Sequence, residues 1–591
     1  MNSGSDTGPS VDRVASADID SEEYMKRPRI SGQTRPRLAG RASLWPWTVT
    51  LFVVLALIAG VSCSPLASPP VDVASPPTHS AAPPTYPIGG YFITAGPNAS
   101  SNKQKLADIK RLGGDTVITF GTVLRPATED SLPEGCLVNG RSCAQVAAGS
   151  LKVNRYFTYA DGSDWGDVVL KCPRDRSVSS NGRSYTVLVL PAEGEGCVSS
   201  DGMYDVVVVG GSRSGADDPS GSLASTATDL GMKYYAGMPA PVKRADFGYL
   251  PDLTYKRTLQ LITERFLQYQ AAKNDVAGLA GFYHHFEMPV SASPFFDPVL
   301  SLYEMQNQAI HRILPTRSAI ISPYIESRLN ASYISLDDAR NGMKRIAQTS
   351  SGVLLNIAIQ DGMGTGKGAA YSAKDADSPV DVFAASIVGK GTWRGKYAAP
   401  NREYFRAAAA GISGTNASLW ANLEGMAPST PSNPCSQSLR GQTTLERMDR
   451  QLQQMVEPTK VISFMWDPYF TCAGTNTSLK TQLQFGFSTP IVTDTSFDAD
   501  SGLLDIIGFN LSGGSATLKW LKKGKSQVEQ MQPVRSNSGY GEQRGLNPRL
   551  ESISIRVSDA VSGTAGSYSL NVTNQWGASA NEAFAIRSLV P

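Results

Sequence analysis

Two glutamates and one aspartate lie at the ends of apolar runs. Glu287 closes residues 278–289 (GLAGFYHHFEMP), Glu424 closes residues 417–426 (ASLWANLEGM), and Asp361 closes residues 353–362 (VLLNIAIQDG). Pro289 cannot donate a ladder hydrogen bond, so the run before it is typical of a buried strand that ends near Glu287. A carboxyl group at such a strand end can serve as an acid, a base or a nucleophile.

Two carboxyl groups on facing sides of an aromatic-lined cleft can cleave a glycosidic bond. One must be protonated to assist the leaving oxygen, while the other attacks the anomeric carbon or activates water. An apolar neighbour such as Phe286 raises the pKa of the acid by desolvation. Trp and Tyr offer flat faces to sugar rings, and Asn, Asp and His can bond hydroxyl groups. The residue types therefore favour hydrolysis of a glycan.

Eight strand-like runs alternate with amphipathic helical patterns, and they begin near residues 89, 115, 232, 278, 318, 353, 417 and 460. The last of them extends over residues 460–470 (KVISFMWDPYF). Continuous apolar strands between amphipathic helices indicate a parallel sheet covered on both faces. Eight such units predict an α/β fold, a (β/α)₈ TIM barrel over residues 88–480. Residues 122–222 interrupt the rhythm with four cysteines and many turns, which predicts a disulfide-stapled β-rich insertion.

In such a barrel the reactive residues lie at the C-terminal ends of the strands. We predict Glu287 and Glu424 as catalytic. Polar and aromatic residues at the same strand ends are predicted to bind substrate: Tyr283, His285, Tyr324, Asp361, Trp420, Asn422, Trp466 and Asp467. His284 and His285 point to opposite faces if the strand persists, so at most one of them faces the cleft. Trp420 and Trp466 fit the barrel core as well as a sugar platform.

Glutamates at the ends of strands 4 and 7 resemble the large clan of retaining (β/α)₈ glycoside hydrolases. More closely, the runs GGYFITAG, GFYHHFEMP, ISPYIESR, AIQDGMG, LWANLEGM and FMWDPYF resemble a bacterial family of glycosyl-hydrolase-like barrel proteins of unknown function. The resemblance implies that Glu287 is the acid/base and Glu424 the nucleophile, with Asp361 as a substrate-binding or supporting carboxylate. Many clan members carry Asn before the acid/base, where this chain has Phe286, so an inverting pair of Asp361 and Glu287 stays open.

Two other functions remain open at this stage. One is a glycan-binding or cell-envelope scaffold that kept the barrel without catalysis, because fold alone does not settle function. The other is a hydrolase of a different linkage that uses Asp361 and a histidine. Residues 362–368 (GMGTGKG) lack the spacing of a phosphate-binding loop, and we expect a flexible loop over the site.

The N-terminal residues predict export. Residues 1–43 are polar and basic, typical of a disordered cytoplasmic tail, and residues 44–63 carry no charge over the length that spans a bilayer. Basic residues lie only before this segment, which places the remainder outside the cytoplasm. The segment is either a single-pass anchor or, if translation begins at Met25, a lipoprotein-type signal with Cys63 lipidated. Residues 64–87 form a Pro-rich linker.

Cysteine usage agrees with export, since six cysteines follow Cys63. Pairing by proximity, one of the fifteen pairings that six cysteines allow, joins Cys136 to Cys143, Cys172 to Cys197 and Cys435 to Cys472. No CxxC motif and only four histidines are present, so neither a metal nor a cofactor is expected. A net charge of +2 gives no electrostatic basis for binding nucleic acid.

The last hundred residues change character. Short strands separated by turns rich in Gly, Ser and Asn over residues 489–591 predict a small β-sandwich. Residues 490–514 resemble the opening of an IPT/TIG-type immunoglobulin-like domain. We therefore expect an exported, membrane-tethered glycan hydrolase with the sandwich as a spacer or a carbohydrate-binding accessory.

Overall fold

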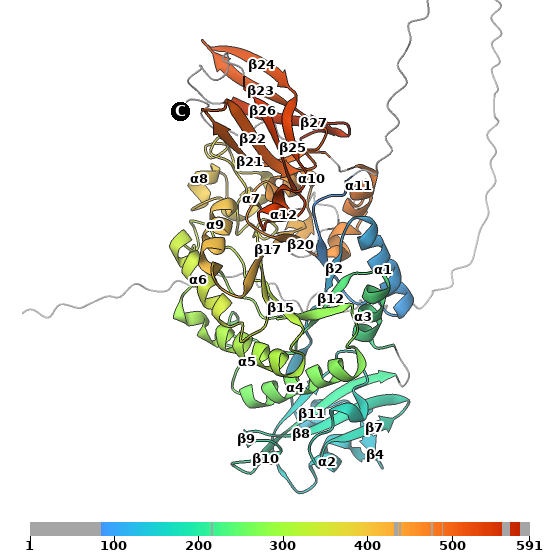
Figure 1. Cartoon of the computed structure of the whole chain (residues 1–591). Helices are drawn as coiled ribbons and strands as arrows, with labels where there is room; N and C mark the ends of the chain where they lie inside the picture. Colours follow the sequence, from blue (N-terminus) through green and yellow to red (C-terminus); the bar gives the residue numbers. More distant parts are fainter. Residues whose placement is uncertain are drawn as a thin grey trace, which may run out of the picture. The chain divides into compact units, whose positions relative to one another are not determined.

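The computed structural model describes residues 84–213, 217–430, 435, 439–473, 477–486, 489–557 and 568–579 (Figure 1). All of them belong to one compact unit, Pro83–Pro591. The predicted tail (residues 1–43), the predicted membrane or signal segment (44–63) and most of the predicted linker (64–87) lie outside the described residues. Among the helices in the described ranges, none combines the length and the apolar character needed to cross a bilayer.

Eight parallel strands close into a barrel, as predicted (Figure 1). In order around the barrel they are β1 (Gly90–Phe92), β2 (Thr116–Ile118), β12 (Lys233–Gly237), β14 (Leu279–Tyr283), β15 (Ser318–Ile321), β16 (Leu355–Gln360), β17 (Ala417–Glu424) and β20 (Lys460–Phe464). Every residue of β16 is buried, because a parallel strand is covered by helices outside and side chains inside. The (β/α)₈ barrel class is confirmed.

Helices cover the outside of the barrel. They are α1 (Ala99–Arg111), α3 (Pro219–Asp229), α4 (Lys256–Lys273), α5 (Asp297–Ile313), α6 (Leu336–Gln348), α7 (Val382–Val388), α8 (Trp393–Lys396), α9 (Asn401–Ile412), α10 (Leu445–Leu452) and α11 (Leu479–Gly486). Helix α4 buries an apolar face that includes Leu259, Ile262 and Phe266. Burying each such side chain is worth about 1.5–3 kcal/mol, so this face fixes the helix on the sheet.

The predicted β-rich insertion is confirmed. Its main sheet has the order β13-β3-β6-β11-β8-β7, from the strands β3 (Val123–Ala127), β6 (Lys152–Tyr159), β7 (Arg176–Ser180), β8 (Arg183–Pro191), β11 (Met203–Arg213) and β13 (Ala240–Pro241). Disulfides join Cys136 to Cys143, beside α2 (Cys143–Ala148), and Cys172 to Cys197. A third joins Cys435 to Cys472. All three pairings match the prediction.

The eighth strand is shorter than predicted. The sequence indicated a strand through residue 470, but β20 ends at Phe464 and the segment Trp466–Phe470 forms a short π-helical turn. Pro468 lacks the N–H that a further ladder bond would need. The aromatic side chains of this turn are instead buried in the hydrophobic core.

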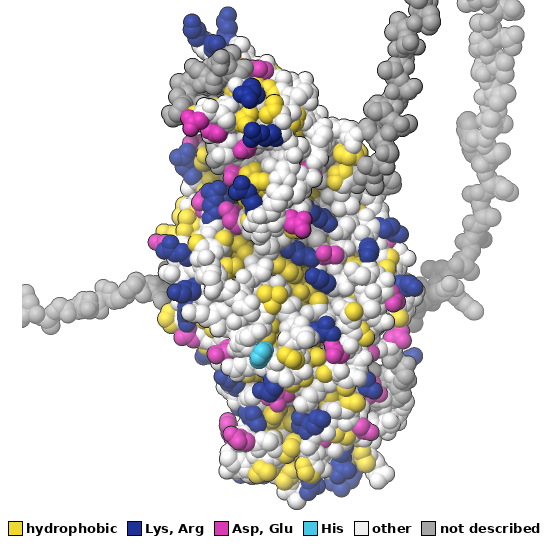
Figure 2. Space-filling model, viewed as in Figure 1, with side chains coloured by type: hydrophobic (Ala, Val, Ile, Leu, Met, Phe, Trp, Pro, Cys, Tyr) yellow, Lys and Arg dark blue, Asp and Glu magenta, His cyan; other side chains and the backbone are white. Residues whose placement is uncertain are grey.

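Two antiparallel sheets form the C-terminal part and confirm the predicted β-sandwich. One consists of β21 (Ile491–Asp498), β22 (Leu503–Phe509), β25 (Pro533–Asn537) and β26 (Leu550–Arg556); the other consists of β23 (Ser515–Lys522), β24 (Lys525–Met531), β27 (Tyr568–Asn574) and β28 (Gly577–Ala578). They share a core that includes Leu504, Ile555, Leu518 and Leu570. On the face of the molecule shown in Figure 2, basic and acidic side chains are interspersed.

Candidate active site

The ends of strands β14, β16 and β17 bring three carboxyl groups to one mouth of the barrel. The register pairs Gln360 with Asn422, which places Asp361 and Glu424 just beyond the level of that pair. Glu287 follows Tyr283, the last residue of β14, by four positions. Because all eight strands are parallel, these residues lie at the C-terminal face, where the sequence predicted them.

Glu287 is partly exposed and lies against aromatic and amide groups. The Tyr283 hydroxyl donates to Glu287 Oε1 at 3.4 Å, and the side chain of Gln360 also hydrogen-bonds the carboxyl group. Burial raises the pKa of Glu287, and the charge of Glu424 raises it further, against the opposing effects of Gln360 and Lys367. This environment favours the protonated carboxyl group that a general acid requires.

Glu424 is buried and has several donors directed at it. The Thr365 N–H donates to Glu424 Oε2 at 2.9 Å, and the Thr365 hydroxyl lies 3.4 Å from the same oxygen. Burial raises the pKa of Glu424, whereas Arg440, Lys367 and the N–H groups of Thr365 and Gly364 lower it. A Cβ at position 364 would lie 2.9 Å from Glu424 Oε2, so glycine permits this close approach. The donors and the two cations stabilise the ionised form.

Asp361 is fully buried behind Glu424, and both of its oxygens accept hydrogen bonds from the protein. Met363 N–H donates to Oδ1 at 3.0 Å, and the Gln451 amide donates to Oδ2 at 2.7 Å. Burial and the charge of Glu424 raise the pKa of Asp361. With both oxygens occupied by backbone and amide donors, Asp361 is suited to supporting Glu424.

The glycine-rich loop 362–368 is compact and has internal hydrogen bonds; its predicted flexibility stays a prediction. Gly362 and Gly366 adopt φ values of +68° and +71°, which turn the loop back so that the Lys367 and Gly368 N–H groups donate to Gly362 O at 2.8 and 3.0 Å. The Arg447 guanidinium holds Met363 O from outside through two 3.1 Å bonds. These bonds define the shape of the loop.

This loop positions a cation at the site. Lys367 Nζ lies 4.0 Å from the centre of the Tyr324 ring, and no carboxylate of the described residues forms an ion pair with it. It does interact at longer range with Glu287, Glu424 and Glu326. Lys367 therefore contributes positive charge near both candidate catalytic glutamates without being neutralised by either.

Several predicted substrate-binding residues join these carboxyl groups. Tyr283 bonds Glu287, and Tyr324 forms β-bridges with Pro289 and Gln360. Asn422 donates to the Ser322 hydroxyl at 3.0 Å, while its buried Oδ1 has no hydrogen-bond partner among the described residues. A buried oxygen without a donor at the barrel mouth can accept a hydrogen bond from a ligand.

β14 ends at Tyr283, before the two histidines, so the strand alternation that the prediction assumed does not apply to them, and their side chains have different surroundings. His284 is buried, and its ring nitrogens lie 2.7 and 2.8 Å from the side-chain oxygens of Gln306 and Asn307 on α5. His285 lies inside, 5.9 Å from the Phe120 ring, and burial together with Lys243 lowers its pKa to about 4. His285 is thus neutral at physiological pH. Within the part of the chain that the structure describes, no three His, Cys, Asp or Glu side chains are grouped to hold a metal ion.

Three predicted residues contact partners other than the glutamates. Trp420 packs near Tyr235 and Lys460, the first residue of β20, and therefore lies toward the opposite end of the barrel. Trp466 is buried between the rings of Tyr91 and Phe470, with no free face. Asp467 forms an ion pair with Lys105 on α1 at 2.5 Å.

Sequence reasoning missed four residues that surround the carboxyl groups: Thr365, Lys367, Arg440 and Gln451. The run GMGTGKG carried a signal for the first two, since its single lysine and threonine follow the Asp361 strand end directly. Arg440 and Gln451 come from β19 (Arg440–Gln442) and α10, and no local motif marks either of them.

No protein-family model matches the chain, and no curated protein matches it significantly. Several solved structures of glycoside hydrolases show a distant similarity to it. A provisionally named alpha-L-fucosidase from Bacteroides thetaiotaomicron has a TM-score of 0.38 and 12% identity, over 67% of this chain and 92% of that one. The endo-beta-1,4-mannanase from Thermotoga petrophila has a TM-score of 0.25 and 9% identity, over 86% and 98%. Endo-glycoceramidase II from Rhodococcus sp. has a TM-score of 0.24 and 11% identity, over 57% and 82%.

Proposed function

We propose that this protein is a glycoside hydrolase that cleaves a cell-surface or extracellular polysaccharide, with Glu287 as acid/base and Glu424 as nucleophile. One observation supports the proposal above all. Burial raises the pKa of both glutamates and each faces two cations, but their hydrogen-bond donors differ. Backbone N–H groups of Thr365 and Gly364 donate to Glu424, whereas among the described residues side chains alone bond Glu287. Backbone N–H donors favour the ionised form of Glu424, so the two carboxyl groups can divide the roles of acid and nucleophile.

The proposed reaction has two steps. The protonated Glu287 carboxyl gives its proton to the leaving oxygen as the glycosidic C–O bond breaks, and Glu424 attacks the anomeric carbon to form a glycosyl ester. Glu287, now ionised, then takes a proton from a water molecule that attacks the same carbon and releases Glu424. Thr365 orients the nucleophile through its bonds to Oε2.

The surroundings of Asp361 favour retention over inversion. An inverting enzyme needs its second carboxylate free to activate water. Both oxygens of Asp361 accept bonds from Met363 and Gln451, and the side chain is fully buried. We therefore assign Asp361 a supporting role in this proposal.

We also propose that residues 44–63 tether the body outside the cytoplasm. Three disulfides support this location, because such bonds persist in oxidising compartments. Protease added to intact cells should degrade the body. If the body is cleaved only after the cells are lysed, the proposal is wrong.

The central experiment is digestion of a broad panel of polysaccharides by the full chain in mild detergent, with detection of new reducing ends. Glu287→Gln and Glu424→Gln should each lower the rate by about 10²–10⁴-fold on a responsive glycan. Glu304→Gln, an exposed change on α5, is the matched control and should leave the rate unchanged.

Three results would change the conclusion. Unaltered rates in both glutamine variants would refute the two-glutamate mechanism. Binding of a glycan without product from any substrate would instead support a non-catalytic glycan-binding protein. Inversion of the anomeric configuration in the first product, detected by NMR, would refute the retaining mechanism.

A further inference from the structure

Aromatic side chains are exposed on two neighbouring loops at the barrel face that carries Glu287. Phe247 and Tyr249 lie on the loop between β12 and α4, and Phe295 lies on the loop between β14 and α5, with exposed fractions of 48%, 39% and 41%. The Phe247 and Phe295 rings meet edge to face, with centroids 5.7 Å apart. Exposed clusters of large apolar side chains commonly mark a binding surface.

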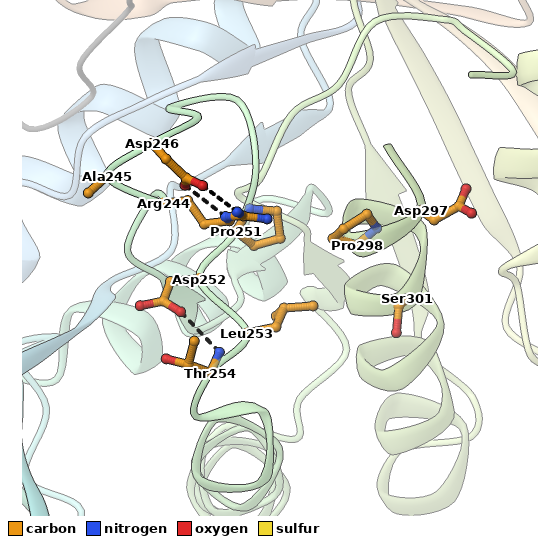
Figure 3. A pocket seen from close by; sticks show the side chains of 10 residues that line it. All are labelled: Arg244, Ala245, Asp246, Pro251, Asp252, Leu253, Thr254, Asp297, Pro298 and Ser301. Carbon is orange, nitrogen blue, oxygen red and sulfur yellow. Dashed lines mark hydrogen bonds and ion pairs between the residues drawn. The ribbon is translucent and has the colours of Figure 1, made fainter. Parts of the chain in front are cut away.

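An open hollow of about 760 Å³ is lined by Arg244 and Asp246, next to Phe247 in the chain, and by Asp297, close after Phe295 (Figure 3). One wall comes from Arg244, Asp246 and Thr254 on the β12–α4 loop, and the opposite wall comes from Asp297 and Ser301 at the start of α5. Its size falls within the roughly 300–1,000 Å³ that small-ligand sites occupy. The hollow thus offers space directly beside a flat apolar surface.

Arg244 connects the hollow to the aromatic pair. Its guanidinium lies 5.5 Å from the centre of the Phe247 ring, and its Nε donates to Asp246 Oδ1 at 2.9 Å. A second guanidinium nitrogen donates to Asp246 Oδ2, and this bidentate pair holds the charged group beside the aromatic ring. Sugar rings require this combination, since their C–H faces stack on aromatics while their hydroxyl groups bond charged and polar side chains.

Tyr249 lies on the same loop as Arg244 and Phe247, on the side toward the catalytic mouth. It lies close enough to Tyr324 to add to the rise in pKa of the Tyr324 hydroxyl, after burial and Glu326. Tyr324 in turn lies beneath Lys367 and bridges Pro289, two residues beyond Glu287. Aromatic side chains thus lead from the candidate catalytic glutamate to the rim.

We propose that Phe247, Tyr249, Phe295 and the adjoining hollow form a distal sugar-binding subsite, which holds pyranose rings of a polysaccharide chain several units from the bond at Glu287. This inference rests on the proposed function and deepens it. A subsite so far along the chain selects long glycans and favours cleavage within them. Free monosaccharides and short oligosaccharides do not reach it.

The test uses the double variant Phe247→Ala/Phe295→Ala in the full chain. Electrophoresis through gels cast with barley β-glucan, konjac glucomannan, birchwood xylan or larch arabinogalactan measures binding without turnover. In the gel that retards the wild type, we expect about tenfold weaker binding from the double variant. On the polysaccharide that is cleaved, KM should rise by about the same factor, with unchanged kcat/KM on its trisaccharide.

A second variant and a control make the result specific. Ser301→Trp fills the hollow from the α5 wall without removing an aromatic residue, and it should cause the same loss. Leu521→Ala/Val528→Ala removes similarly exposed apolar side chains from β23 and β24 of the sandwich and should change neither measurement.

The outcomes separate the two proposals. Loss of retardation in both site variants without product from the wild type supports the subsite and refutes the hydrolase. Cleavage that is unaltered in both variants refutes the subsite and leaves the hydrolase standing. The subsite proposal is also refuted if no gel retards the wild type. It is refuted as well if the wild type is a dimer that dissociates in the double variant, because the aromatic residues would then form a dimer interface.

Discussion

Asp361 and Glu424 are held together by one side chain, the amide of Gln451. Its Nε2 donates to Asp361 Oδ2 at 2.7 Å and to the Glu424 carbonyl oxygen at 3.1 Å. The Glu424 N–H in turn approaches Asp361 Oδ1 at 3.4 Å. The ends of β16 and β17 are therefore linked through α10, and the position of the proposed nucleophile depends on a residue that makes no contact with its carboxyl group.

Gln451→Ala removes both bonds and leaves two buried acceptors without this donor. We expect a loss of about 1–3 kcal/mol in the free energy of unfolding, together with a lower kcat, because Glu424 loses its support. Urea unfolding and steady-state kinetics measure the two effects. Gln308→Ala, at an exposed position on α5, should change neither; an unchanged kcat in Gln451→Ala would show that this amide does not position Glu424.

Lys367→Met should move the whole pH profile of activity to higher pH. In the proposed mechanism the acidic limb reports ionisation of Glu424, and the basic limb reports loss of the proton from Glu287. Lys367 lowers the pKa of both glutamates, so its removal raises both. The measurement is kcat/KM against pH beside the exposed control Lys344→Met. A profile that stays in place, or moves to lower pH, contradicts the assignment.

Asp449 should make the protein less stable as pH rises. Tyr86 donates to its Oδ1 at 2.8 Å, but burial raises the pKa of Asp449 from 3.8 to about 7. Between these values the folded state binds a proton that the unfolded state has lost, so the free energy of unfolding falls by up to about 4 kcal/mol from this group.

Asp449→Asn should abolish this part of the pH dependence. Unfolding curves from pH 4 to pH 7.5 should therefore show the variant gaining stability relative to the wild type as pH increases. The exposed change Asp229→Asn serves as the control. Parallel curves for Asp449→Asn and the wild type would mean that Asp449 titrates normally in the folded protein.

Removal of individual disulfides should lower stability in each case but lower activity only for the disulfide near the site. Cys435–Cys472 and Cys172–Cys197 span 37 and 25 residues, and removal of either should cost about 3–4 kcal/mol in the chain-entropy model. Only the first is close to the site, because Cys435 lies between β18 (Met426–Pro428) and β19, the strand that carries Arg440. Paired Cys→Ser variants at both sites should lower the melting temperature, but only Cys435→Ser/Cys472→Ser should also lower kcat. Equal kcat values would contradict this link.

The barrel was predictable because buried parallel strands leave continuous apolar runs in the sequence. The alternation with amphipathic helices gave the number of strands, although β14 ends at Tyr283, four residues before the end predicted near Glu287. Counting strands could not place side chains along them. Trp420 lies four residues, or about 13 Å, before Glu424 on the same strand, so a shared strand did not mean a shared site.

Residues that tune the carboxyl groups were harder to find. Arg440 and Gln451 come from a hairpin strand and a helix without a periodic or catalytic motif, and only tertiary packing brings them to Glu424. Lys367 was visible in the glycine-rich run, but the sequence did not reveal that the left-handed glycines Gly362 and Gly366 fold it inward.

The insertion also bears on how the barrel closes during folding. β2 and β12 pair directly in the barrel, although more than 100 residues separate them in the chain. Val123, near the start of the insertion, and Arg213, near its end, belong to the same sheet. If the insertion folds first, the flexible chain between β2 and β12 is therefore shortened to a few tens of residues. By polymer theory this lowers the entropy cost of closure by about 1 kcal/mol. An oxidised, prefolded insertion would thus speed the pairing of the second and third barrel strands, and reducing conditions during synthesis would delay it.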